Sequence, residues 1–160
     1  MFDGTEFVQA LVQSGVTHVI WIPDSETGRW ETALRTAPPL KLLRVSREGE
    51  AMALAAGLMI GGQFPVVIIQ CTGLFEAGDA LRNVVHDLKL PLFLFIGLRG
   101  YYARLKGSTF DTCPIYTEPI LKAWQIPYRL LTEKHTVDDF VAAYREMQST
   151  GKAGAVLVAE

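Results

Sequence analysis

Two segments of the chain are apolar at nearly every position, and they limit the fold more than any other feature. The first is PVVIIQ at residues 65–70, and the second is LFLFI at 92–96. A strand without a polar face must be covered on both sides, which is typical of a parallel sheet with helices above and below it. The sequence therefore predicts an α/β fold.

The remaining elements alternate between strand and helix along the chain. Further β-branched and apolar runs predict strands at 18–22, 41–45, 128–131 and 155–159. Apolar spacing and Gly or Pro stops predict helices at 5–14, 29–36, 48–60, 76–88, 118–124 and 137–147. The mixed polar segment 97–112 is predicted to be a long loop or lid. We expect one domain over residues 1–160, with three α/β/α layers around a six-stranded, mostly parallel sheet.

Composition excludes several classes of function. The 160 residues carry a formal net charge of -2, so we expect no nucleic-acid or membrane partner, which normally requires a basic face. Cys71 and Cys113 are isolated and predict neither a disulfide framework nor a cysteine zinc site. The longest apolar run, 90–98, is too short to span a bilayer, and no signal pattern opens the sequence. A cytoplasmic location is expected.

Binding sites in parallel α/β sheets lie beyond the carboxyl ends of the strands. In this chain the candidate positions are 23–27, 46–50, 70–75 and 97–102. The loop PDSETG lacks the glycines of a dinucleotide fingerprint, and Asp79 and Ala80 stand where a phosphate loop needs Lys and Ser or Thr. No nucleophile elbow occurs, and the three histidines have no metal-binding spacing, so no metal site is predicted on this chain.

Glu48 stands at one of these strand ends, and two explanations of it are open. A carboxylate in the first turn of a helix complements the helix dipole, an effect of about 0.3 to 1 kcal/mol. A capping box from Ser46 is not supported, because position 49 is Gly rather than Glu or Gln. On the residues alone the dipole explanation is favoured, and a catalytic carboxyl is the alternative.

The sequence also resembles a known family over roughly residues 5 to 100. The segment REGEAMALAAGL, from residue 47, is similar to the glutamate-bearing helix of the pyrimidine-binding (PYR) domain of thiamine diphosphate enzymes, and is most similar to phosphonopyruvate and sulfopyruvate decarboxylases. GVTHVIWIPDS at 15–25, QCTGL at 70–74 and PLFLFIGLRG at 91–100 resemble further segments of that family in the same order. The last third of the chain matches only in general pattern.

The resemblance implies a cofactor, a reaction and site residues. In the family this glutamate hydrogen-bonds the pyrimidine of thiamine diphosphate and promotes the tautomer that removes the thiazolium proton, so that a 2-oxo acid is decarboxylated. By position in the motif, Glu48 is the expected catalytic and cofactor-binding residue, and Glu50 is not. Thr72, Gly73 and Leu74 are expected at the cofactor. The expected substrate contacts are Asp24, Ser25, Phe75 and Arg99.

The chain departs from this family after Leu74. Related decarboxylases have a glycine and an amide where this chain has Phe75 and Glu76. If Glu76 faced the pocket it would repel a second anionic group on the substrate, so a sulfonate or phosphonate substrate is in doubt. Arg99 either binds such a group or ties its loop to the sheet. Asp24 and Ser25 either orient the keto acid or are ordinary turn residues.

The magnesium site of thiamine enzymes is missing from the sequence. In the family a Gly-Asp-Gly followed at a distance by Asn binds Mg²⁺ and the diphosphate, whereas this chain has Gly78-Asp79-Ala80 and a single asparagine, Asn83. The resemblance therefore implies a separate diphosphate-binding (beta) subunit that carries the Gly-Asp-Gly motif and most of the Mg²⁺ ligands, as in the split sulfopyruvate decarboxylases. Hetero-oligomers with PYR–PYR contacts are expected.

Three functions follow as alternatives. The first is the alpha subunit of a heteromeric thiamine diphosphate-dependent 2-oxo acid decarboxylase. The second is a subunit of a split carboligase similar to acetolactate synthase. The third is a non-catalytic scaffold or regulatory subunit with the same fold. The sequence does not identify the 2-oxo acid, the subunit stoichiometry or the role of the segment 97–118.

Overall fold

The computed structural model describes residues 2–160, which form a six-stranded sheet with helices on both faces. Every neighbouring pair of strands is parallel, so the sheet is fully parallel rather than mostly parallel. The strands lie in the order β2-β1-β3-β4-β6-β5. Their bounds are β1 (His18–Trp21), β2 (Lys41–Arg44), β3 (Pro65–Gln70), β4 (Phe93–Leu98), β5 (Tyr128–Leu131) and β6 (Gly154–Ala159). The predicted three-layer α/β/α architecture is confirmed.

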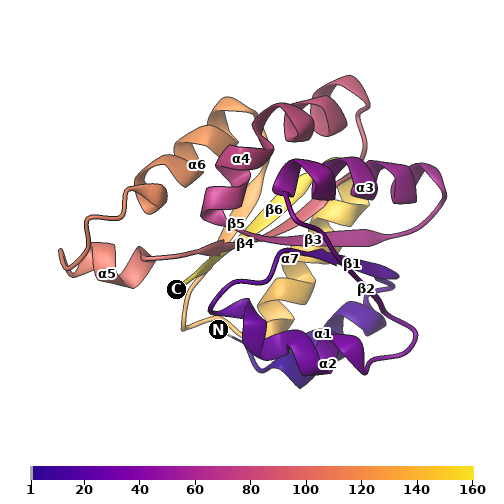
Figure 1. The fold of residues 1–160 in the computed structure, drawn as a ribbon, viewed down its shortest axis with the longest axis horizontal. Helices are drawn as coiled ribbons and strands as arrows, with labels where there is room; N and C mark the ends of the chain where they lie inside the picture. Colours follow the sequence, from indigo (N-terminus) through magenta and orange to yellow (C-terminus); the bar gives the residue numbers. More distant parts are fainter. Residues whose placement is uncertain (1) are drawn as a thin grey trace.

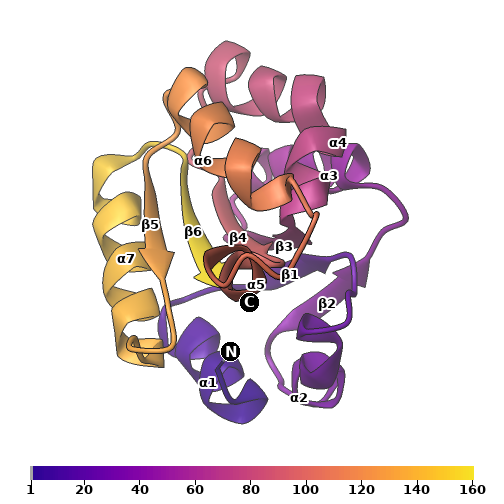
Figure 2. The same cartoon turned by 90° about the vertical axis from the view of Figure 1, so that its left-hand side faces the viewer.

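The helices divide between the two faces of the sheet (Figure 2). On one face lie α3 (Glu48–Ile60), α4 (Cys71–Arg82) with the π-helical turn η2 (Asn83–Asp87), and α6 (Cys113–Ala123). On the other lie α1 (Gly4–Gln13), the short η1 (Thr27–Trp30), α2 (Glu31–Arg35) and α7 (Val137–Thr150). The short α5 (Tyr101–Leu105) follows β4.

The central strands are buried on both faces, as their composition predicted. Val67 and Ile69 of β3 face the core under α3 and α4, whereas Val66 and Ile68 face the other core. That second core contains an aromatic cluster, in which the ring centroids of Phe7 and Trp30 are 4.3 Å apart. These strands bury apolar side chains on both faces and pair with a strand on each side. A shift in register would disturb both, so the pairing of the strands is fixed.

Two helices begin earlier than the sequence predicts. The helix expected at 76–88 starts at Cys71, directly after β3, so that Thr72, Gly73 and Leu74 form its first turn instead of a loop. The helix expected at 118–124 starts at Cys113, and the predicted loop 97–112 contains α5. Neither start has a side-chain cap, and such a start leaves no signal in the sequence.

The loops that follow β1, β2, β3 and β4 gather at the carboxyl edge of the sheet. In Figure 1 this edge carries α5 and the end of the chain, and Figure 2 looks onto it with both in front of the strands. Among the helices of residues 2–160, none has the length and apolar character needed to cross a membrane. The carboxyl edge is where the predicted site residues meet.

Candidate functional site

Glu48 is the first residue of α3, and its side chain lies against the first turn of α4. A Cβ atom placed on Gly73 would be only 2.5 Å from Cγ of Glu48 and 2.6 Å from its Oε1, so a larger residue there would force the Glu48 side chain to move. Glycine leaves the room that this position of Glu48 requires. The structure brings together two predicted cofactor residues that are 25 positions apart in the sequence (73 − 48).

The Glu48 carboxylate is free for a ligand. Among the hydrogen bonds and ion pairs of residues 2–160, none uses its oxygens, and the residue is half-buried. Met52, one turn further along α3, is fully buried beneath it. The nearby Glu50 differs, because its Oε2 accepts a hydrogen bond from the Ser46 backbone N–H at 3.1 Å. An unpaired carboxylate in this position can hydrogen-bond a nitrogen atom of a bound cofactor.

The other predicted cofactor residues lie around the same turn. The Thr72 hydroxyl donates to Oε1 of Gln70 at 3.3 Å, which holds it near the end of β3. Leu74 is fully buried, so its side chain belongs to the core and only its backbone is left for a ligand. Phe75 is half-buried and packs on the edge of the same core.

The loop after β1 points one carboxylate inward. Oδ1 of Asp24 accepts hydrogen bonds from the backbone N–H groups of Glu26 at 2.8 Å and Thr27 at 2.7 Å. Its Oδ2 is buried without a partner, whereas Ser25 is exposed. Asp24 thus shapes the turn with one oxygen, and its other oxygen is buried and unpaired.

A second carboxylate, Glu160, lies near Asp24 and was missed by sequence reasoning. It follows β6 directly, rests against the Cα of Gly97, and has both carboxylate oxygens buried without a hydrogen-bond partner. Burial, and then the negative charges of Asp24 and Glu26, raise the pKa of Glu160 to about 7. The one available signal was an acidic residue directly after a buried strand, at the edge where sites form.

Arg99 joins two parts of the carboxyl edge. Its Nε donates to Oδ2 of Asp111 at 3.0 Å, and its Nη1 donates to Oε1 of Gln70 at 3.1 Å. The Asp111 carboxylate raises the pKa of Arg99, and the pKa of Asp111 is lowered, first by the Cys113 backbone N–H and then by Arg99. The guanidinium therefore ties the segment before α6 to the end of β3, although 48% of the side chain stays exposed.

Two thiols lie beside this tie. Burial, reinforced by the neighbouring Cys113, raises the pKa of Cys71 to about 12, and burial also raises the pKa of Cys113. Both are free thiols. A thiol with a raised pKa is a weaker nucleophile at neutral pH, and Cys71 is in addition buried in the core.

Residues 2–160 contain no group of three His, Cys, Asp or Glu side chains placed to hold a metal ion. Asp79, the acidic residue of the Gly-Asp-Ala sequence, lies on α4 and accepts hydrogen bonds from Arg82, with Nε at 3.0 Å.

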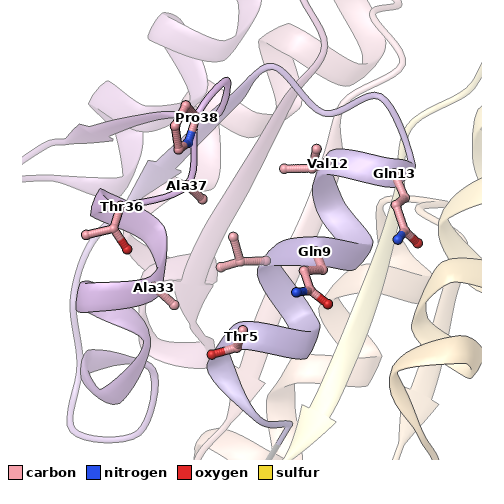
Figure 3. A pocket seen from close by; sticks show the side chains of 9 residues that line it. Thr5, Gln9, Val12, Gln13, Ala33, Thr36, Ala37 and Pro38 are labelled. Atoms are coloured by element: carbon pink, nitrogen blue, oxygen red, sulfur yellow. The ribbon is translucent and has the colours of Figure 1, made fainter.

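A hollow of about 380 Å³ lies between α1 and α2, well away from Glu48, and is lined by uncharged residues such as Gln9 and Thr36 (Figure 3).

Comparison with known proteins gives relatives of one kind. No family model matches the chain. It is 28% identical over 124 residues to a phosphonopyruvate decarboxylase of Streptomyces viridochromogenes, and 29% identical over 124 residues to that of Streptomyces hygroscopicus. Each alignment covers 71% of this chain and 31% of the relative, so the chain matches under a third of their length.

The third relative is the alpha subunit of sulfopyruvate decarboxylase from Methanococcus maripaludis. It is 26% identical over 122 residues, which cover 75% of this chain and 71% of that subunit. These relatives confirm the resemblance that the sequence segments indicated: the chain is similar to phosphonopyruvate and sulfopyruvate decarboxylases.

Proposed function

We propose that this chain is the pyrimidine-binding (alpha) subunit of a heteromeric, thiamine diphosphate-dependent 2-oxo acid decarboxylase. The observation that carries the proposal is the position of Glu48, whose free carboxylate lies over Gly73 at the carboxyl edge of the sheet. The helix dipole alone accounts for a carboxylate at this helix start, but it does not account for a glycine that makes room for its side chain.

In the proposed reaction the protein supplies position and proton transfer. Bound thiamine diphosphate supplies the electron sink that decarboxylation requires. Glu48 would hydrogen-bond the pyrimidine ring of the bound cofactor, with Gly73 fixing where its carboxylate lies. Asp24 is proposed to orient the 2-oxo acid from the β1 loop, where its Oδ2 is buried without a hydrogen-bond partner. Thr72 and the backbone of Gly73 and Leu74 line the cofactor side of the site.

The proposal includes a partner chain, which holds the diphosphate and Mg²⁺. It is supported by a relative that is named as a subunit and is covered over 71% of its length. The segment next to the carboxyl edge also exposes large apolar side chains, among them Leu105, Phe110 and Tyr116. Large exposed apolar side chains are typical of protein interfaces, and a partner chain would cover these.

An assay of carbon dioxide release tests the proposal. The chain is mixed with a diphosphate-binding subunit that carries the Gly-Asp-Gly motif. Thiamine diphosphate and Mg²⁺ are added, and the release of carbon dioxide is measured from each of a panel of 2-oxo acids. Turnover is expected only when both chains are present, with an aldehyde as the second product. A 2-hydroxy-3-oxo acid or another carbon–carbon coupled product would instead identify a carboligase. No turnover with any 2-oxo acid, despite complex formation, would identify a non-catalytic subunit.

A further inference from the structure

Glu76, in the second turn of α4, is hydrogen-bonded to the residues on both sides of Glu48. Its Oε1 accepts from Nε of Arg47 at 2.8 Å, and its Oε2 accepts from the backbone N–H of Gly49 at 2.8 Å. One carboxylate therefore binds the Arg47 side chain before the candidate catalytic residue and the Gly49 backbone after it.

The start of α3 has no cap of its own. Arg47, the residue that precedes the helix, makes no side-chain capping hydrogen bond, and the Ser46 side chain does not supply one. The first N–H groups of a helix need acceptors from elsewhere, and a carboxylate is favoured there because it also complements the helix dipole. Glu76 provides that acceptor from the neighbouring helix.

The side chain of Glu48 is fixed by the same surface of α4. Gly73 and Glu76 are three residues apart, so they lie on one face of that helix. Gly73 leaves room for the Glu48 side chain, and Glu76 binds the flanking backbone. The α4 face therefore determines both where the Glu48 backbone lies and how far its carboxylate extends.

The negative charge of Glu76 is balanced by the groups that bind it. The Gly49 N–H, and then the Arg47 guanidinium, lower the pKa of Glu76, so it stays ionised at neutral pH. Its side chain is 30% exposed and is turned toward α3. A carboxylate committed to α3 and to Arg47 is not a free charge that would repel an anionic substrate.

We propose that Glu76 is a positioning residue for Glu48, which clamps the start of α3 to α4 by binding Arg47 and Gly49. Its effect on catalysis rests on the function proposed for Glu48, whereas the clamp itself is a property of the isolated chain. The two are therefore tested by separate measurements.

The first measurement is made on the isolated chain by NMR. In Glu76→Ala the Gly49 amide is expected to exchange with solvent about 10-fold faster, because it loses a hydrogen bond to a charged acceptor. The carboxyl carbon signal of Glu48 is expected to move. Glu76→Gln keeps a carbonyl oxygen for the Gly49 N–H and is expected to restore most of the protection. Asp79→Asn is the matched control, because Asp79 lies on the same helix, is 79% exposed and contacts Arg82 instead of α3.

The second measurement is made on the complex with the diphosphate-binding subunit. Glu76→Ala is expected to lower kcat for 2-oxo acid decarboxylation about 10-fold with little change in KM, and Glu76→Gln is expected to recover part of it. If Glu76→Ala does not fold, Glu76→Gln carries both measurements, with a smaller effect in the same direction.

The outcomes separate the two proposals. Faster Gly49 exchange in Glu76→Ala, together with a wild-type complex that shows no turnover, supports the clamp and contradicts the proposed function. The clamp is overturned if the wild-type complex turns over and Glu76→Ala behaves like Asp79→Asn. The two variants would then agree in Gly49 amide exchange, in the Glu48 carboxyl signal and in kcat.

Discussion

The Glu48 side chain packs directly against the Cα of Gly73, in the space that the methyl group of an alanine would occupy. A Cβ on Gly73 would lie 2.6 Å from Oε1 of Glu48, so the first turn of α4 and the first turn of α3 can pack in this way only with glycine. The candidate catalytic carboxylate is therefore held by shape as well as by hydrogen bonds to its neighbours.

Gly73→Ala is expected to displace Glu48 and to destabilise the fold by about 1–3 kcal/mol, as overpacking of a close contact does. Thermal unfolding of the isolated chain measures the effect. Gly78→Ala on the same helix is the control, because its Cβ would meet only the Trp124 ring at 3.9 Å. That change is expected to be neutral or to stabilise by about 0.5–1 kcal/mol, since alanine favours a helix. Equal effects at both positions would mean that the contact with Glu48 imposes no constraint.

Glu160 makes stability depend on pH. Its folded-state pKa, about 7, lies above the ordinary value of 4.5, so the folded protein binds the proton more tightly than the unfolded chain does. The stability from this group is complete below pH 4.5 and is lost as the pH rises through 7. Asp24 and Glu26 add to the shift, and Arg29 opposes it.

Glu160→Gln is accordingly expected to raise the melting temperature at pH 8 and to leave it nearly unchanged at pH 5. The gain at pH 8 should be about 1–2 kcal/mol, after allowance for the partial exposure of the Glu160 residue as a whole. The exposed Glu133→Gln serves as the control and should show no difference between the two pH values. A Glu160→Gln effect of the same size at both pH values would show that Glu160 is ionised in the fold across this range.

Asp111→Asn tests the tie between the segment before α6 and the sheet. It removes the charged acceptor of Arg99 but keeps that guanidinium and its contact with Gln70. Because about half of the Arg99 side chain (48%) is exposed, the expected loss of stability is only about 0.5 kcal/mol. Limited proteolysis within residues 101–112 is expected to become several-fold faster. An unchanged cleavage rate would show that the backbone of this segment is held by other contacts.

Much of the architecture could be predicted, because it depends on local composition. The apolar strands β3 and β4 required cover on both faces, and the alternating pattern required a parallel sheet. The start of α4 was predicted five residues late because Gln70 and Cys71 carry no capping signal. The all-parallel pairing and the strand order arise from contacts between distant segments, which the sequence pattern does not contain.

The site was predictable only in part, for the same reason. Glu48 and Gly73 were predicted from their motifs and Asp24 from the loop that follows a strand, and their roles stay predictions. The clamp from Glu76 spans 27 residues to Gly49, and the burial of Glu160 depends on the β1 loop folding toward β6. Such contacts form only when the sheet assembles, so composition and spacing could not reveal them.

The central claim is that Glu48 performs the proton chemistry of a 2-oxo acid decarboxylase. The most direct test is the rate of carbon dioxide release by the two-chain complex with Glu48→Gln, compared with Glu50→Gln. Both residues lie in the first turn of α3, but only Glu50 is engaged with the Ser46 backbone. The account predicts that Glu48→Gln lowers kcat by roughly 10²–10⁴-fold and that Glu50→Gln changes it less than about threefold. Full turnover in Glu48→Gln would contradict it.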